Sequence, residues 1–357
     1  MAAMRVLLCA IAIAAPGCAH KPCDPTREAC AYEKAVSTLT VPAGHEDEDT
    51  CQSWTLHNPT ELWVNSITQH NDGAYHHANW FFVPDTQWPL PDGLWTCSTN
   101  SFAPFMEVEA ALEGGYLFAL STQSHVETQT MPAGAAIRIP PYSRLIGASH
   151  LLNGTDAAVT TTMSLEIDTI PPATVTAKLA PARVQYEDLH IDPSARSSFT
   201  TECDLATSYQ SFFHQPLSQY ALYYTLSHYH ALGTYQQLEV AGGPSDGMVI
   251  MRHDGFGNNA GTAIDPPVDL VALGATGVRV TCGYDNPRAA TVGWGIGDQE
   301  MCVIALQATT DVGWAGDVTI GTDHVTDVGA DGEIHHAGTC GMQVFPWDFT
   351  KPGGNGP

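Results

Sequence analysis

The chain has 357 residues, of which 44% are hydrophobic, and its 13 basic and 38 acidic side chains give a formal net charge of −25. This length and apolar content predict about two domains with filled cores and exclude a disordered chain. The excess of acidic residues argues against DNA, RNA and anionic lipid as partners, because each of them carries negative charge.

Residues 1–17 have the form of an export signal. Arg5 precedes a short apolar run that ends at Ala15, too short to span a bilayer stably, and small residues lead to Cys18. This pattern resembles a bacterial lipoprotein signal with Cys18 as the lipidated first mature residue; an ordinary secretory signal cut nearby is the alternative. We therefore expect an exported protein, at the outer membrane or in the periplasm of a Gram-negative bacterium, that touches the membrane only through this anchor.

Export determines how the ten cysteines are interpreted. Cys9 lies in the signal and Cys18 would carry lipid, and the eight that remain predict disulfides in an oxidising compartment. Cys23 and Cys30 could close a small loop within residues 18–36, a polar stretch without periodicity that we interpret as a tether. No CxxC pair is present, which argues against a zinc ribbon or a thioredoxin-like site.

From residue 37 onward the sequence predicts short strands separated by Gly, Pro, Asn and Asp. The clearest strands are expected at 63–67, 79–83, 115–120, 144–148, 158–165, 278–282 and 301–306. A Pro-rich segment at 173–182 is expected to be a linker or an edge strand. The prediction is an all-β protein of two tandem jelly-roll or β-sandwich domains, at 37–172 and 183–345, followed by a tail at 346–357 that frays at its end.

Several of the sixteen histidines form clusters. On an ideal strand His228 and His230 project from the same face, so both imidazoles could reach one metal, although a chance pair on the surface is the alternative. His76 and His77 would point to opposite faces unless the strand bends, and taken alone they are two solvated histidines. His150 ends an apolar strand and, taken alone, is a partly buried histidine with its hydrogen bonds satisfied.

Met301 is the second kind of candidate ligand. A strand methionine ordinarily packs in a core, but its thioether is a soft ligand that suits Cu(I) better than Zn, Mg or Ca. If histidine and methionine together in an exported chain bind a metal, that metal is therefore expected to be copper.

The order of these residues resembles the type II, ascorbate-dependent copper monooxygenases, the family of peptidylglycine α-hydroxylating monooxygenase and dopamine β-monooxygenase. The matching features are, in chain order, His76-His77, His150 before an Asn-containing loop, His228-x-His230 followed by Leu232-Gly233, and Glu300-Met301-Cys302. Each motif is short, and the specificity comes from finding them in this order over about residues 45–345.

The resemblance implies two β-sandwich domains that face each other across a cleft, with two coppers per chain. The electron-transfer copper would be held by His76, His77 and His150. The oxygen-activating copper, at the catalytic site, would be held by His228, His230 and Met301. The resemblance also implies the disulfides Cys51–Cys97, Cys203–Cys340 and Cys282–Cys302. It gives no oligomeric state.

The implied activity is hydroxylation of an aliphatic or benzylic C–H bond by O2, with ascorbate or a similar reductant. Peptide-hydroxylating members hold a peptide carboxylate with an Arg and a Tyr, where this chain has Leu226 and Ala305. Their loss predicts a small apolar or neutral substrate in place of a peptide that ends in glycine. The alternatives are a non-catalytic exported copper-binding or surface interaction protein on the same scaffold, and a jelly-roll adhesion module with surface histidines.

Overall fold

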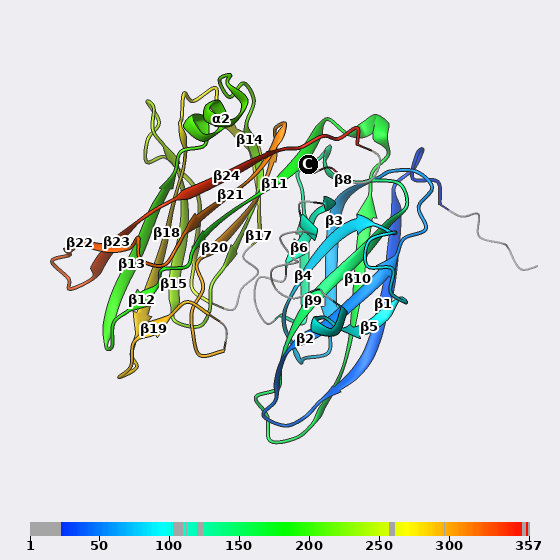
Figure 1. Ribbon diagram of the computed structural model, residues 1–357, viewed down its shortest axis with the longest axis horizontal. Coiled ribbons are helices and arrows are strands. Elements are labelled where there is room, and N and C mark those ends of the chain that lie inside the picture. The colour runs from blue at the N-terminus through cyan, green and yellow to red at the C-terminus, as the bar shows by residue number, and fades with distance from the viewer. Residues whose placement is uncertain are drawn as a thin grey trace, which may run out of the picture.

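The fold is mostly β, with several sheets in a jelly-roll-like arrangement of two lobes (Figure 1). The computed structural model describes residues 23–100, 102, 110–111, 113–119, 124–256, 261–295, 297–351 and 355. The expected signal at 1–17 and the expected lipidation site Cys18 lie outside these residues. Among the helices that are described, none is long and apolar enough to cross a membrane.

Two sheets enclose the core of the first lobe. One has the strand order β5 (Gly93–Thr96), β2 (Glu46–Thr55), β9 (Ser143–Leu152), β4 (Tyr75–Pro84) and β6 (Gly115–Ala119). The other contains β1 (Cys30–Val41), β10 (Val159–Thr169), β3 (Leu62–Asn71) and β8 (Ala135–Ile139), with β7 (Val126–Thr130) beside β3. Burial alternates along β10, where Met163, Leu165 and Ile167 are fully buried, because successive strand residues face opposite sides. β1 begins at Cys30, within the segment that the sequence assigns to a tether.

The second lobe repeats this arrangement. One sheet contains β24 (Gly341–Pro346), β21 (Val312–Val318), β11 (Ala177–Tyr186), β20 (Val303–Thr309), β14 (Ala221–His228) and β17 (Gly261–Asp269). The facing sheet has the order β16 (Val249–Asp254), β15 (Gly233–Ala241), β18 (Gly277–Asn286), β13 (Ala195–Cys203), β23 (Ile334–Thr339) and β22 (His324–Val328). The smaller elements are β12 (His190–Ile191), β19 (Val292–Gly293), α2 (Leu205–Phe213), η1 (Ser98–Asn100) and η2 (Pro172–Thr174). Strands expected at 63–67, 79–83, 144–148 and 278–282 lie within β3, β4, β9 and β18.

One strand, β11, joins the two lobes. Its first residues, Ala177–Leu179, pair in parallel with Ala135–Ile137 of β8 in the first lobe. From Ala180 onward it pairs with β20 on one side and with β21 on the other. The segment expected at 173–182 to be a linker or an edge strand is therefore largely the start of a central strand, and both lobes share one 11-stranded sheet.

The tail also returns to the first lobe, where Asn355 is buried (Figure 1). Its side-chain oxygen accepts a hydrogen bond from Arg138 Nη1 at 2.9 Å, and its amide nitrogen donates to the Arg138 carbonyl at 2.9 Å. The prediction that the end of the chain frays is wrong at this residue. A buried polar side chain keeps its place only when its hydrogen bonds are satisfied, and Arg138 satisfies them here.

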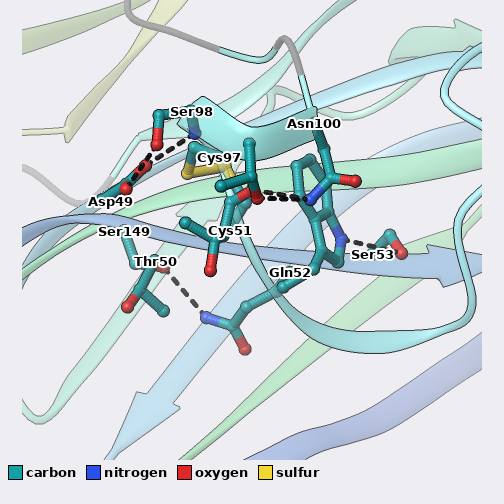
Figure 2. The surroundings of a disulfide bond; sticks show 12 residues. Asp49, Thr50, Cys51, Gln52, Ser53, Cys97, Ser98, Asn100 and Ser149 are labelled. Carbon is teal, nitrogen blue, oxygen red and sulfur yellow. Dashed lines mark hydrogen bonds between the residues drawn. A yellow bond between two sulfur atoms is a disulfide. The ribbon is translucent and has the colours of Figure 1, made fainter.

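Four disulfides cross-link the described part of the chain: Cys23–Cys30, Cys51–Cys97, Cys203–Cys340 and Cys282–Cys302. All three pairs that the resemblance implies are confirmed, and so is the small N-terminal loop. Figure 2 shows the Cys51–Cys97 bond, beside which the Asp49 carboxylate accepts hydrogen bonds from the Ser98 backbone and hydroxyl, both at 2.6 Å. Multiple disulfides are typical of exported proteins.

Candidate metal centre

Four imidazole rings from the two lobes form a continuous line. The ring centroids of His76 and His150 are 5.0 Å apart, and both residues belong to the first lobe. The His76 ring also lies 5.7 Å from that of His230, which in turn lies 5.4 Å from His228. The two histidine groups that the sequence assigns to separate domains therefore meet at one place between the lobes.

His76 lies at an irregularity of its strand. The register between β4 and β9 shifts between Tyr75 and His77, and the His77 backbone pairs with that of His150. Register shifts of this kind commonly accompany a local bend, which the adjacent histidines would need if both were to serve one site. The His77 side chain itself lies outside the described part of the structure, so its predicted role as a ligand stays a prediction.

His150 is buried beside two carboxylates that the sequence analysis did not single out. Its Nε2 lies 2.8 Å from Glu46 Oε1 and 3.9 Å from Glu48 Oε1. Glu46 and Glu48 are two residues apart on β2, so they share a face, and their spacing was the signal available in the sequence. A carboxylate that holds one nitrogen of a histidine orients the ring and makes its other nitrogen a stronger metal ligand.

His230 is held in the tautomer that a metal ligand needs. A backbone carbonyl can only accept, so the His230 Nδ1, 2.9 Å from the Gln299 carbonyl, carries the proton and donates it. The lone pair is then on Nε2. Burial lowers the pKa of His230, which keeps the ring neutral. β14 ends at His228, so His230 lies beyond the strand on which it was predicted, although the two rings still approach each other.

Glu300 fixes the backbone of this histidine pair. Its buried carboxylate accepts from the His230 N–H at 2.8 Å and from the Leu232 N–H at 2.7 Å. Burial raises the pKa of Glu300 to about 7, and the backbone hydrogen bonds act against that shift. The acidic residue of the Glu300-Met301-Cys302 motif therefore has a structural role that the sequence analysis did not assign.

Close packing explains why a glycine, Gly233, follows the His228 and His230 pair. A Cβ on Gly233 would lie 2.1 Å from the ring of Tyr229, so no larger residue fits under that ring. The Tyr229 hydroxyl donates to the Gly255 carbonyl and lies 2.6 Å from His253 Nδ1. Tyr229 and Glu300 thus hold the histidine pair from two sides.

Met301 lies just before β20, and not within a strand as the sequence predicts. It is half-buried, and it lines a cavity of about 440 Å³ together with His150 and His228. The cavity lies between the lobes. Most of its lining is apolar, and it includes Phe81, Tyr116, Leu226, Trp294, Val303, Ala305, Trp314 and Phe345.

This set of donors is chemically suited to copper. Imidazole nitrogens bind both of its common oxidation states, and a thioether favours Cu(I). The partners that orient the rings are also present, in Glu46 at His150 and in the Gln299 carbonyl at His230.

Comparisons with known proteins give this chain no family. No family model matches the chain, and no curated protein matches it in sequence. Among solved structures, the major capsid protein P2 of bacteriophage PM2 is 9% identical over 79% of this chain and 98% of its own, with a TM-score of 0.29. PNGase F, a glycosylasparaginase from Flavobacterium meningosepticum, is 9% identical over 77% of this chain and 96% of its own, also with a TM-score of 0.29.

Proposed function

We propose that this chain is a copper-dependent monooxygenase, similar to the type II ascorbate-dependent enzymes, which hydroxylates an aliphatic or benzylic C–H bond of a small substrate. The observation that supports the proposal best is the line of four imidazoles from both lobes. Two of these histidines, His150 and His228, line one largely apolar cavity together with Met301. A cavity of this kind is where a small molecule ordinarily binds.

Two groups of ligands divide between the lobes in this proposal. His76, His77 and His150 would hold one copper, and His228, His230 and Met301 the other. When bound, copper supplies the one-electron chemistry by which O2 oxidises a C–H bond, with ascorbate or a similar donor as the source of electrons. Glu46 contacts the ring of His150, and Glu300 accepts from the backbone of His230. Tyr229 lies between His228 and His230 in the sequence and is anchored through its hydroxyl to the Gly255 carbonyl.

The chain's own side chains would place the substrate and exclude water. Leu226, Val303 and Ala305 line the cavity beside His228 and Met301, so a hydrocarbon group fits next to the proposed catalytic ligands. Aromatic rings from both lobes also line the cavity and would limit the access of bulk water to the reacting carbon.

The proposal includes a location. The disulfides indicate an exported protein. Attachment to the outer membrane through lipid on Cys18 rests on the signal-like N-terminus alone. Mass spectrometry of the membrane fraction should find a lipidated mature chain that starts at Cys18. A mature chain that starts at any other residue would refute the lipoprotein part.

The decisive experiment combines metal analysis with oxygen incorporation. Purified chain should bind two coppers, and with ascorbate and 18O2 it should place one labelled oxygen in a small hydrophobic substrate. His150→Ala should lose one copper and keep the other, while His190→Ala, a change at an exposed histidine, should alter nothing.

Each other outcome selects an alternative. Copper binding without any oxygen incorporation would favour a non-catalytic copper-binding protein on this scaffold. No specific copper binding would refute the proposal and leave a surface module. A single copper lost equally on changing His76 or His228 would mean that the touching rings form one site.

A further inference from the structure

A basic side chain lies in the floor of the cavity, where an apolar substrate gives it nothing to bind. The floor is one face of the second-lobe sheet, and its register aligns a row of residues across five strands. The row runs Leu226, Ala305, Arg183, Ala315 and Gln343 from β14 to β24. All five line the cavity, with Arg183 at the centre of the row.

The cross-strand neighbours of Arg183 are small. Ala305 is its partner on one side of the row and Ala315 on the other, and both line the same cavity. Residues directly opposite on neighbouring strands share a face, so a ligand on this face meets Arg183 between two small side chains.

The hydrogen-bonding capacity of Arg183 is only partly used. Its Nη2 lies 3.1 Å from Asp317 Oδ1, and this is its ion pair in the described structure. Its Nε is buried and has no hydrogen-bond partner among the described residues. A guanidinium has five N–H donors and accepts nothing, so the donors that remain fit an oxygen acceptor. The side chain is 38% exposed, which leaves it open to a ligand.

Asp317 also limits the kind of acceptor. It neutralises much of the charge of Arg183, and the chain as a whole carries a net charge of −25, so the site does not require a full negative charge on its ligand. Carboxylate and amide oxygens both satisfy the geometry. The aromatic lining, with Trp294 and Trp314, suits an apolar body attached to that oxygen.

The sheet sets the length of such a ligand. Arg183 is two strands away from Leu226, or about 10 Å at the usual spacing of neighbouring strands, and His228 lies two residues farther along β14, at about 12 Å. A ring with a short chain spans this distance once the long arginine side chain is allowed for.

We propose that Arg183 binds the oxygen-acceptor head group of the substrate, a small molecule with a carboxylate or amide oxygen at one end and an apolar body that reaches His228 and Met301. That this ligand is a substrate rests on the proposed function, whereas its binding to Arg183 does not. The donor that the Leu226 and Ala305 positions lack is thus present on β11, next to Ala305 and two strands from Leu226. The small apolar or neutral substrate expected from the sequence gains an oxygen acceptor at one end.

The test uses metal-free protein and three ligands of similar shape: 4-ethylbenzoate, 4-ethylbenzamide and 1-ethyl-4-methylbenzene. Isothermal titration and the fluorescence of Trp294 and Trp314 report binding without copper or turnover. The wild-type chain should bind at least one of the two oxygen-bearing ligands about ten-fold or more tighter than the hydrocarbon, because hydrogen bonds from a charged donor are strong. Arg183→Met should remove that difference.

Matched variants identify the head group and check the fold. Asp317→Asn should strengthen binding of the carboxylate more than that of the amide. Arg196→Met, which removes an arginine paired with Asp331 on the surface, should change nothing. If Arg183→Met melts early, Arg183→Lys, which keeps the charge but not the planar fork, should show a partial loss.

Equal affinity of the wild-type chain for all three ligands, no binding at all, or unchanged preference in Arg183→Met would each overturn the inference. A chain that binds through Arg183 but takes no copper would refute the proposed function and leave this binding site standing.

Discussion

At the scale of single residues, Glu300 is a buried carboxylate that accepts two backbone hydrogen bonds. Only 1% of its surface is exposed, and its two oxygens accept backbone N–H groups of His230 and Leu232. A buried N–H that loses its acceptor costs about 1–3 kcal/mol. The position of the histidine pair therefore depends on a residue that binds neither substrate nor metal.

We expect a graded loss when Glu300 is changed. Glu300→Gln keeps one acceptor oxygen and should lower the free energy of unfolding by about 1–3 kcal/mol, and Glu300→Leu, which keeps none, should lower it further. Chemical denaturation measures this, and copper content should fall in the same order. Glu333→Gln, at a partly exposed position away from the histidine pair, is the control. Equal stability and full copper content in Glu300→Leu would contradict the assigned role.

Met301 tests the chemistry at the same scale. Met301→Ile, similar in bulk, should fold normally and still bind Cu(II), because the imidazoles supply most of the affinity. The sulfur scatterer should disappear from the X-ray absorption spectrum of the Cu(I) form, and most of the hydroxylation should be lost. His228→Ala should instead lose the copper. An unchanged sulfur signal and unchanged turnover would make Met301 an ordinary packing residue.

At the scale of elements, alternation and turn residues predicted many strands well. β3, β4, β9 and β18 were found because each contains a run that is apolar or alternates. β11 was less clear, since proline at 171, 172 and 181 is typical of a linker or an edge. That one strand belongs to both lobes depends on pairing between residues far apart in the sequence, and no local pattern predicts it.

Long-range pairing also explains what the sequence left out of the site. Each histidine was recognisable, but the approach of His76 to His230 depends on how the lobes meet. Arg183 was not singled out, because its place beside Ala305 follows from the register between β11 and β20. Glu46 and Glu48 had a readable spacing but lie about a hundred residues from His150, so nothing local joined them to it.

The Cys203–Cys340 disulfide joins the end of β13 to the turn between β23 and β24, across a separation of 137 residues. Packing around it is close, since a Cβ on Gly316 would lie 2.6 Å from both sulfurs. On the loop-entropy model, replacing both cysteines by serine should cost about 5 kcal/mol of unfolding free energy.

The Cys23–Cys30 bond is the internal control for that prediction. It closes a short loop with a separation of 7 residues, so removing it should cost only about 2–3 kcal/mol on the same model. Denaturation of the two double variants beside the wild-type chain compares them directly. Equal losses would show that loop length does not determine the stabilisation here.

At the scale of the whole molecule, two connections set how the lobes meet. β11 continues from one lobe into the other, and the tail after β24 returns to the first lobe (Figure 1). There Arg138 is buried, and it donates to Glu61, to the Lys351 carbonyl and to Asn355. The cavity and the line of imidazoles both lie between the lobes. The hydrogen bonds of Arg138 therefore affect the geometry of the site, although Arg138 does not contact it.

Asn355→Ala should therefore loosen the lobes while leaving each one folded. Arg138 would lose one acceptor for its side chain and one donor to its carbonyl, at a cost of about 1–3 kcal/mol. Amide hydrogen exchange should become faster in β8, which carries Arg138, and stay unchanged in β15, on the far sheet of the second lobe. The affinity of the copper-free protein for its small-molecule ligand should fall as well, because residues of both lobes line the cavity. Asn100→Ala, which removes a hydrogen bond to Thr96 within the first lobe, should leave exchange in β8 as it was. If Asn355→Ala exchanged like the wild-type chain in β8 and kept full ligand affinity, β11 alone would hold the lobes together.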